Sequence, residues 1–148
     1  MLRFANDTDD IAYGITKLTN LFDFEEERAK FDKYVVIGSC RDGDPIVINT
    51  NENDIIEELD HEDLFSPIFF NSSINALAAF IIIYRDFEDS VLTEYAEEGW
   101  RNFYFTDDQF DLLKSRMLYI DNKALMEYGF WKDELDILVS LRKEYLKK

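Results

Sequence analysis

Cysteine and histidine are almost missing from this chain, which has one of each, Cys40 and His61, among its 148 residues. A single cysteine excludes an internal disulfide. A single histidine excludes the HExxH pattern of zinc peptidases, in which position 65 would be a second histidine and is Phe65 here. The GxSxG, P-loop and GxGxxG motifs do not occur either. The sequence thus offers no positive evidence for catalysis, and we expect a protein that is not an enzyme.

Positive charge is also scarce, because 16 Lys and Arg face 32 Asp and Glu and give a formal net charge of −16. Such a field repels phosphate backbones and anionic lipid surfaces, so we expect no direct nucleic-acid ligand. A basic protein partner would instead be attracted, with an effect mainly on association rate and specificity. Charge alone is equally compatible with simple solubility.

The longest apolar run of the chain is too short for a membrane-spanning helix. The run Ala76–Tyr84 is far shorter than the about 20 residues that cross a bilayer, and Arg85 and Asp86 end it. The N-terminus has no basic region followed by the apolar stretch of a signal peptide. We therefore expect a cytoplasmic protein that does not contact membranes.

Apolar side chains are nevertheless abundant enough for a folded core. They make up 47% of the residues and include 13 Phe, 8 Tyr and 2 Trp, which is too hydrophobic for a disordered acidic tail. A chain of 148 residues suits one domain that buries a core without disulfides or metal. We expect a single domain over residues 1–148.

The N-terminal half has the pattern of strands. Two β-branched runs, Tyr34–Ile37 and Pro45–Ile48, flank a loop with an Asp-Gly pair and predict an antiparallel hairpin. Ile55–Leu59 predicts a third strand. Leu64–Phe70 is expected to add an edge strand, because Pro67 is tolerated there and not in a central ladder. Together these runs predict a meander.

The stretch Ile68–Phe87 is the segment around which the rest of the chain is organised, as a strand end, a cap and a buried helix. Asn71, Ser72 and Ser73 can each accept a hydrogen bond from the first helical turn, and we favour Asn71 or Ser72 as the N-cap. The unbroken apolar run that follows predicts a helix that buries more than one face.

Helices fill the C-terminal half. Asp89–Gly99 is expected to continue the helix and Gly99 to stop it, and core packing is favoured over an exposed contact patch for the aromatic run Trp100–Phe105. Thr106–Gln109 has capping-box spacing. A short helix over 124–126, capped by Asp121 and ended by Gly129, precedes a last helix over Lys132–Leu146. Strands first and helices second predict an α+β fold, with an antiparallel sheet packed against helices.

Three groups of residues could carry chemistry, and a structural role is favoured for each. His61 lies among acidic residues, where a metal or acid–base site competes with a turn. The spacing Asn49-Asn51-Asn53 resembles a calcium loop, but Asp54 replaces the glycine that such a loop needs, so a polar turn is favoured. Cys40 and His61 show no sign of a nucleophile and its base. We expect no catalytic, metal or cofactor-binding residues.

Several segments, taken in order, resemble the SUKH superfamily of bacterial immunity proteins, which is related to the Smi/Knr group. They are Tyr34–Gly38, Gly43–Ile48, Leu59–Glu62, Phe70–Ser73 with its apolar helix, and Ile120–Leu125 followed by Phe130-Trp131. In one SUKH subgroup the pattern is Ile-Asp-Pro-x-Ala-Leu, so Asn122 stands where proline is expected. The resemblance covers residues 34–140.

The resemblance implies an α+β domain that binds and neutralises a cognate toxin, often a nuclease, with no catalytic residues of its own. The shared residues are interpreted as turn and cap positions: Gly38, Gly43, Asp44, Pro45, Asn71 and Ser72. With the acidic charge, it predicts a basic toxin domain as the partner. The alternative is a regulatory module that recognises a cellular protein through the sheet or its edge.

Overall fold

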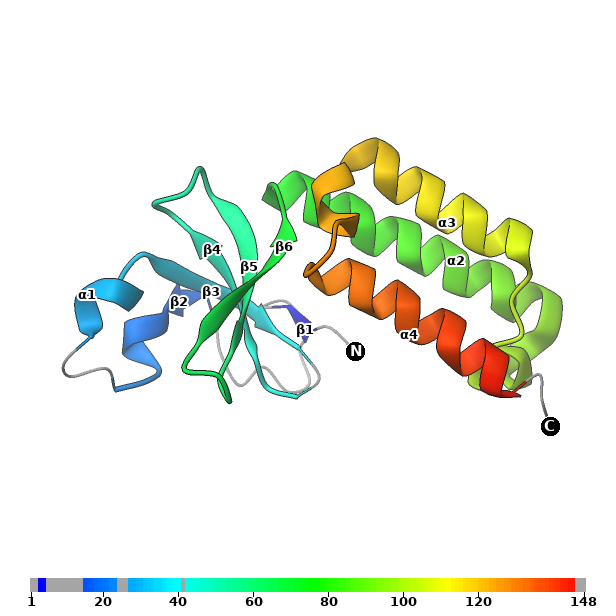
Figure 1. The fold of residues 1–148 in the computed structure, drawn as a ribbon, viewed down its shortest axis with the longest axis horizontal. Helices are drawn as coiled ribbons and strands as arrows, with labels where there is room; N and C mark the ends of the chain where they lie inside the picture. Colours follow the sequence, from blue (N-terminus) through cyan, green and yellow to red (C-terminus); the bar gives the residue numbers. More distant parts are fainter. Residues whose placement is uncertain (1–2, 5–14, 24–26, 41, 146–148) are drawn as a thin grey trace. The chain divides into compact units, whose positions relative to one another are not determined.

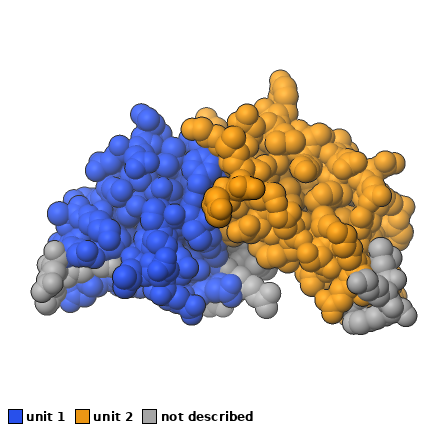
Figure 2. Space-filling model, in the orientation of Figure 1, with its two compact units in different colours: residues 1–74 blue, residues 75–148 orange. Residues whose placement is uncertain are grey.

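The computed structural model describes residues 3–4, 15–23, 27–40 and 42–145. The chain divides into two compact units, Met1–Ile74 and Asn75–Lys148, which Figure 2 shows in different colours. Strands lie in the first unit and long helices in the second, so the predicted α+β fold class is confirmed. A single domain over the whole chain stays a prediction.

The first unit contains an antiparallel sheet (Figure 1). Four of its strands follow one another as a meander: β3 (Tyr34–Ser39), β4 (Pro45–Asn49), β5 (Ile55–Asp60) and β6 (Ser66–Asn71). Two short strands pair with β3 on the side away from β4: β1 (Arg3–Phe4) and β2 (Thr16–Lys17). The predicted meander and its four strands are confirmed.

Strand β6 lies at the edge of this sheet, as its proline predicts. It pairs with β5, and Pro67 stands opposite Leu59 in the register. Because proline has no backbone N–H to donate, an edge position costs no ladder hydrogen bond on the outer side. The pairing shifts by one residue between Ile56 and Glu57, where a bulge interrupts the ladder.

One face of the sheet forms the core of the first unit. The side chains of Val36, Val47 and Leu59 are fully buried there, on three adjacent strands. Two short helices contribute to the same cluster, η1 (Leu18–Asn20) through Leu18 and α1 (Arg28–Phe31) through Phe31. The β-branched pattern of the strands therefore produces a core that these two turns help to cover.

The second unit consists of three long helices and one short one (Figure 1). Their bounds are α2 (Ile74–Arg101), α3 (Asp107–Ile120), η2 (Asn122–Leu125) and α4 (Phe130–Tyr145). Trp131 of α4 packs on two rings of α2, with centroid distances of 5.3 Å to Phe80 and 6.0 Å to Tyr84. Arg116 of α3 forms an ion pair with Asp86 of α2 at 2.7 Å. None of the helices described is both long enough and apolar enough to cross a bilayer.

Helix α2 begins later than we predicted, and it is not buried all round. Its first residue is Ile74, whereas a cap at Asn71 or Ser72 would start the helix at residue 72 or 73. The reason is that β6 continues through Asn71, which still pairs with Ile56 in the ladder. Helix α2 contacts both α3 and α4, as a helix that buries more than one face should, but within the apolar run Ile82 is 59% exposed.

Gly99 does not end this helix. The chain is kinked at Ala96, whose φ of 57° and ψ of −167° are not helical, and helix resumes through Arg101. A Cβ atom at Gly99 would lie 2.0 Å from Cβ of Tyr95, so glycine is needed for a close approach and not for a stop. The aromatic run that follows is partly buried, with Phe105 packed 5.4 Å from Phe87, as the favoured core role predicts.

The capping box at α3 is confirmed. The side chain of Thr106 accepts a hydrogen bond from the Gln109 N–H, and the Gln109 side chain accepts one from the Thr106 N–H. Gly129, by contrast, does not end the short helix before it. Its carbonyl accepts hydrogen bonds from the N–H groups of Lys132 and Asp133, so it opens α4, which begins two residues before the predicted start.

Asp121 has the N-cap position that we predicted, at the start of η2, but its side chain makes no capping hydrogen bond. The short helix is a 3₁₀ turn that ends at Leu125, one residue before the predicted end. Leu146, the predicted last residue of the final helix, lies outside the described residues.

The kink at Ala96 predicts that replacing alanine by glycine stabilises the protein at position 96 and destabilises it at position 78. Ala96→Gly is expected to stabilise the protein by about 1 kcal/mol, because glycine adopts this backbone conformation without a Cβ clash. Ala78→Gly, at an exposed helical position of the same helix, is the matched control and is expected to cost about 1 kcal/mol. Urea unfolding of both variants measures the difference, and destabilisation of similar size in both would contradict the kink.

Candidate functional site

Two loops of the first unit meet at one end of the sheet and form the first candidate surface. Asp44 ends the β3–β4 loop and His61 begins the β5–β6 turn. One carboxylate oxygen of Asp44, Oδ1, accepts the His61 backbone N–H at 2.9 Å and lies 2.6 Å from Nδ1 of its ring. Alternate turns of a meander share an end of the sheet, so the topology brings together two residues that are 17 positions apart.

This contact perturbs the histidine. The hydrogen bond to Asp44 raises the pKa of His61 above its usual value of 6.5, and the negative charge of Asp44 acts in the same direction. The charges of Glu62 and Asp60 raise the pKa further. The ring is therefore more easily protonated here than in an unfolded chain, and its protonated form places a positive charge between the two loops.

We call residues 42–44 and 60–64 the acidic loop pair. Its turn is held by Asp60, whose Oδ1 accepts the backbone N–H groups of Glu62 at 2.9 Å and Asp63 at 3.1 Å. The side chain of Leu64, at the end of this turn, is 83% exposed, and Asp42 in the other loop is exposed as well. The pair thus presents several carboxylates and one large apolar side chain to solvent.

Negative charge is concentrated in the unit that carries these loops. Residues 1–74 contain 17 Asp and Glu against 6 Lys and Arg, a net charge of −11, whereas residues 75–148 contain 15 against 10, a net charge of −5. The overall charge of the chain did not reveal this difference between its two halves. The acidic loop pair lies in the more strongly charged unit.

The core of the first unit also contains a carboxylate that sequence reasoning missed. Glu57 of β5 is buried, and its Oε2 accepts a hydrogen bond from Nδ2 of Asn49 at 2.8 Å. Burial raises the pKa of Glu57 above its usual 4.5, more than the bond to Asn49 lowers it. Burial, together with the charges of Glu57 and Glu52, raises the pKa of Tyr34 to about 12.

Cys40 and Asn49, which the sequence suggested as possible nucleophile and calcium ligand, have hydrogen bonds that stabilise a loop and the core. Cys40 is buried, and its backbone closes the β3–β4 loop through hydrogen bonds with Asp44 and Gly43. Asn49, the first residue of the calcium-like spacing, is buried and bonded to Glu57, and residues 50–54 form the predicted polar turn. In the part of the chain that is described, no group of three His, Cys, Asp or Glu side chains is placed to hold a metal ion.

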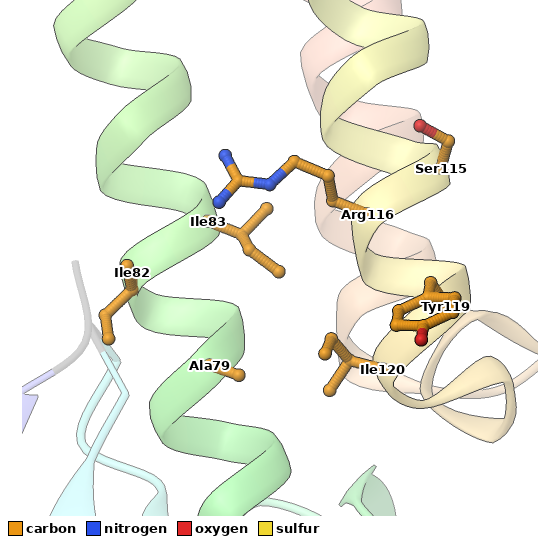
Figure 3. A pocket seen from close by; sticks show the side chains of 7 residues that line it. All are labelled: Ala79, Ile82, Ile83, Ser115, Arg116, Tyr119 and Ile120. Atoms are coloured by element: carbon orange, nitrogen blue, oxygen red, sulfur yellow. The ribbon is translucent and has the colours of Figure 1, made fainter.

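A second candidate surface lies in the second unit, between α2 and α3. It is a groove of about 400 Å³ lined by Ala79, Ile82 and Ile83 of α2 and by Ser115, Arg116, Tyr119 and Ile120 of α3. Figure 3 shows Ala79 and Ile83 pointing toward α3, and Arg116 reaching toward α2. Tyr119 is 90% exposed at the rim. The apolar run Ala76–Tyr84 could not reveal this groove, because the sequence does not show which face of the helix other helices leave uncovered.

Comparison of the chain with family models, with curated proteins and with solved structures finds no match in any of the three. The SUKH resemblance therefore stays a prediction.

The Asp44–His61 contact predicts a specific change in titration. Asp44→Asn removes the charge that favours the imidazolium, so the pKa of His61 should fall back toward 6.5, whereas Asp42→Asn should leave it raised. His61 is the single histidine of the chain, so its ring gives one assignable NMR signal. The contact should stabilise the protein below pH 6.5, and this effect should be lost as pH rises through the raised pKa. An unchanged titration in Asp44→Asn would contradict the contact.

The buried carboxylate of Glu57 predicts that the protein loses stability as the pH rises above 4.5. Because its pKa is raised, Glu57 destabilises the folded state once the pH exceeds 4.5, where the unfolded chain ionises first. Glu57→Gln should therefore raise the melting temperature at pH 7 and change it little at pH 4. Thermal unfolding at both pH values measures this, with Glu62→Gln as the exposed control. If Glu57→Gln instead lowers the melting temperature at pH 7, the ionised carboxylate of Glu57 stabilises the fold and the prediction is wrong.

Proposed function

We propose that this protein is a cytoplasmic immunity protein of the SUKH type, which neutralises a basic toxin domain of the nuclease kind by stoichiometric binding. The ordered resemblance over residues 34–140 and the charge of −16 support the proposal. The observation that carries it is the acidic loop pair, where exposed carboxylates share two loops with the exposed Leu64. We therefore propose that the first unit carries the contact surface.

A nuclease domain needs positive charge on the face that binds nucleic acid. A domain that cleaves nucleic acid binds the phosphate backbone through Lys and Arg, so its binding face is basic. A unit with a net charge of −11 is attracted to such a face and, once bound, keeps nucleic acid away from it. Neutralisation by occupation of the basic face requires no catalytic residue in this chain.

Leu64 adds what charge alone does not supply. Protein interfaces have an apolar centre within a polar rim, and a few buried anchors carry most of the binding free energy. Leu64 is 83% exposed and lies directly after Glu62 and Asp63, so it fits the role of an anchor with acidic neighbours. The loop geometry that presents it depends on the hydrogen bonds of Asp60 and Asp44.

Calorimetry with a panel of basic nuclease toxin domains, including any encoded beside this protein, tests the proposal. We expect one domain to bind tightly at a ratio of 1:1, to lose nuclease activity, and to bind more weakly at high salt. Leu64→Ala should cost on the order of 1 kcal/mol or more of binding free energy. Glu62→Gln combined with Asp63→Asn should slow association by about tenfold at low salt.

The matched control is the pair Glu98→Gln and Glu127→Gln, two exposed acids of the second unit. It changes the net charge by the same amount and should leave the association rate nearly unchanged. If both double variants slow association equally, the net charge of the chain attracts the toxin and the acidic loop pair is not a specific contact surface. Failure of every toxin domain to bind at low salt would overturn the immunity function itself.

The alternative function is a regulatory module that recognises a cellular protein, and the edge strand favours it. Strand β6 ends the strand order, and no further strand pairs with its outer side in the described sheet. An extended peptide can add to such an edge. Capture of a cellular protein that competes with a strand peptide for β6, with no toxin bound, would favour this alternative.

A further inference from the structure

We infer that the groove between α2 and α3 is a docking site for an amphipathic helix of a partner protein, with apolar residues at one end and Lys or Arg about two turns away. The inference concerns the second unit and does not depend on the immunity function. It rests on the exposed apolar residues of the groove and on the charges that continue its two helices.

The apolar end of this surface is formed by both helices. Ile82 of α2 is 59% exposed, and on α3 Tyr119 and Ile120 are 90% and 44% exposed. The lining also contains Ala79 of α2 and Ser115 of α3, whose side chains are small. A groove of this composition accepts the apolar face of a helix, which is anchored through residues spaced by three or four positions.

The other end of the surface is acidic. On α2, Asp86 and Asp89 lie four and seven residues after Ile82, which places them on the same side of the helix. On α3, Asp111 and Asp108 lie four and seven residues before Ser115 and continue its stripe in the same way. The two helices are antiparallel, with Asp86 paired to Arg116 and Ser90 bonded to Gln109, so both acidic stretches lie at the same end.

Charge complementarity defines the occupant. Asp86 is paired with Arg116, and three exposed carboxylates remain, on Asp89, Asp108 and Asp111, against two exposed cations, Arg85 and Lys114. From Ile82 to Asp89 the helix rises by roughly 10 Å. A partner helix that places apolar side chains over the groove would thus meet this acidic end about seven residues later, where Lys or Arg is favoured. A second copy of this chain would bring the same carboxylates and a further −16, which opposes self-docking.

Fluorescence anisotropy with the full chain and a panel of labelled synthetic helices tests the inference. Each peptide has leucines at positions i and i+4 and two lysines six, seven or eight residues later, and a control set has glutamate in place of lysine. We expect at least one lysine peptide to bind at low salt and its glutamate counterpart to bind at least about tenfold more weakly. Binding should weaken about fivefold or more in Tyr119→Ala and in Asp111→Lys.

Two variants with the same chemistry elsewhere are the controls. Tyr128→Ala removes a tyrosine that is 88% exposed and outside the groove, and Glu98→Lys reverses an exposed acid of the same unit. Neither should change binding. The inference is overturned if no peptide of the panel binds, if the control variants weaken binding as much as the groove variants, or if the glutamate peptides bind equally well. It is also overturned if sedimentation shows a dimer that Tyr119→Ala dissociates, because a second copy would then occupy the groove.

Discussion

The contact between Asp44 and His61 is the interaction on which the exposed end of the sheet depends. A single carboxylate oxygen accepts two hydrogen bonds from one residue, the backbone N–H and the ring of His61. It joins two loops that both carry negative charge, and the His61 ring, when it is protonated, offsets part of their mutual repulsion. Leu64, the exposed apolar side chain of the surface that we propose for a partner, lies three residues after this junction.

In the second unit, helix α2 is packed differently on the side of α4 and on the side of α3. Helix α2 places Phe80 and Tyr84 against Trp131 of α4, and these large rings fill that side of the helix. On the side of α3, Ala79 has a small side chain, and the surface between the two helices is open as a groove. The same apolar run therefore supplies a core on one side and an accessible surface on the other.

Local chemistry was predictable from the sequence, and positions set by tertiary structure were not. The β-branched runs and the capping box of Thr106 act within a few residues, so their strands and helix start follow from the sequence. Gly99 suggested a helix stop, but its role depends on the approach of Tyr95 after a kink that no local signal marks. The pairing of Asp44 with His61 depends on the register of three strands.

The placement of the tryptophans has a consequence for how the folding of this protein can be followed. Trp100 and Trp131 both belong to the second unit, and both lie near Tyr84, at centroid distances of 6.4 and 6.0 Å. Indole fluorescence therefore reports the loss of that unit's aromatic cluster, whereas the circular dichroism of the strands reports the first unit. If the two signals change together on denaturation, the chain behaves as one cooperative body, and if they separate, each unit has a stability of its own.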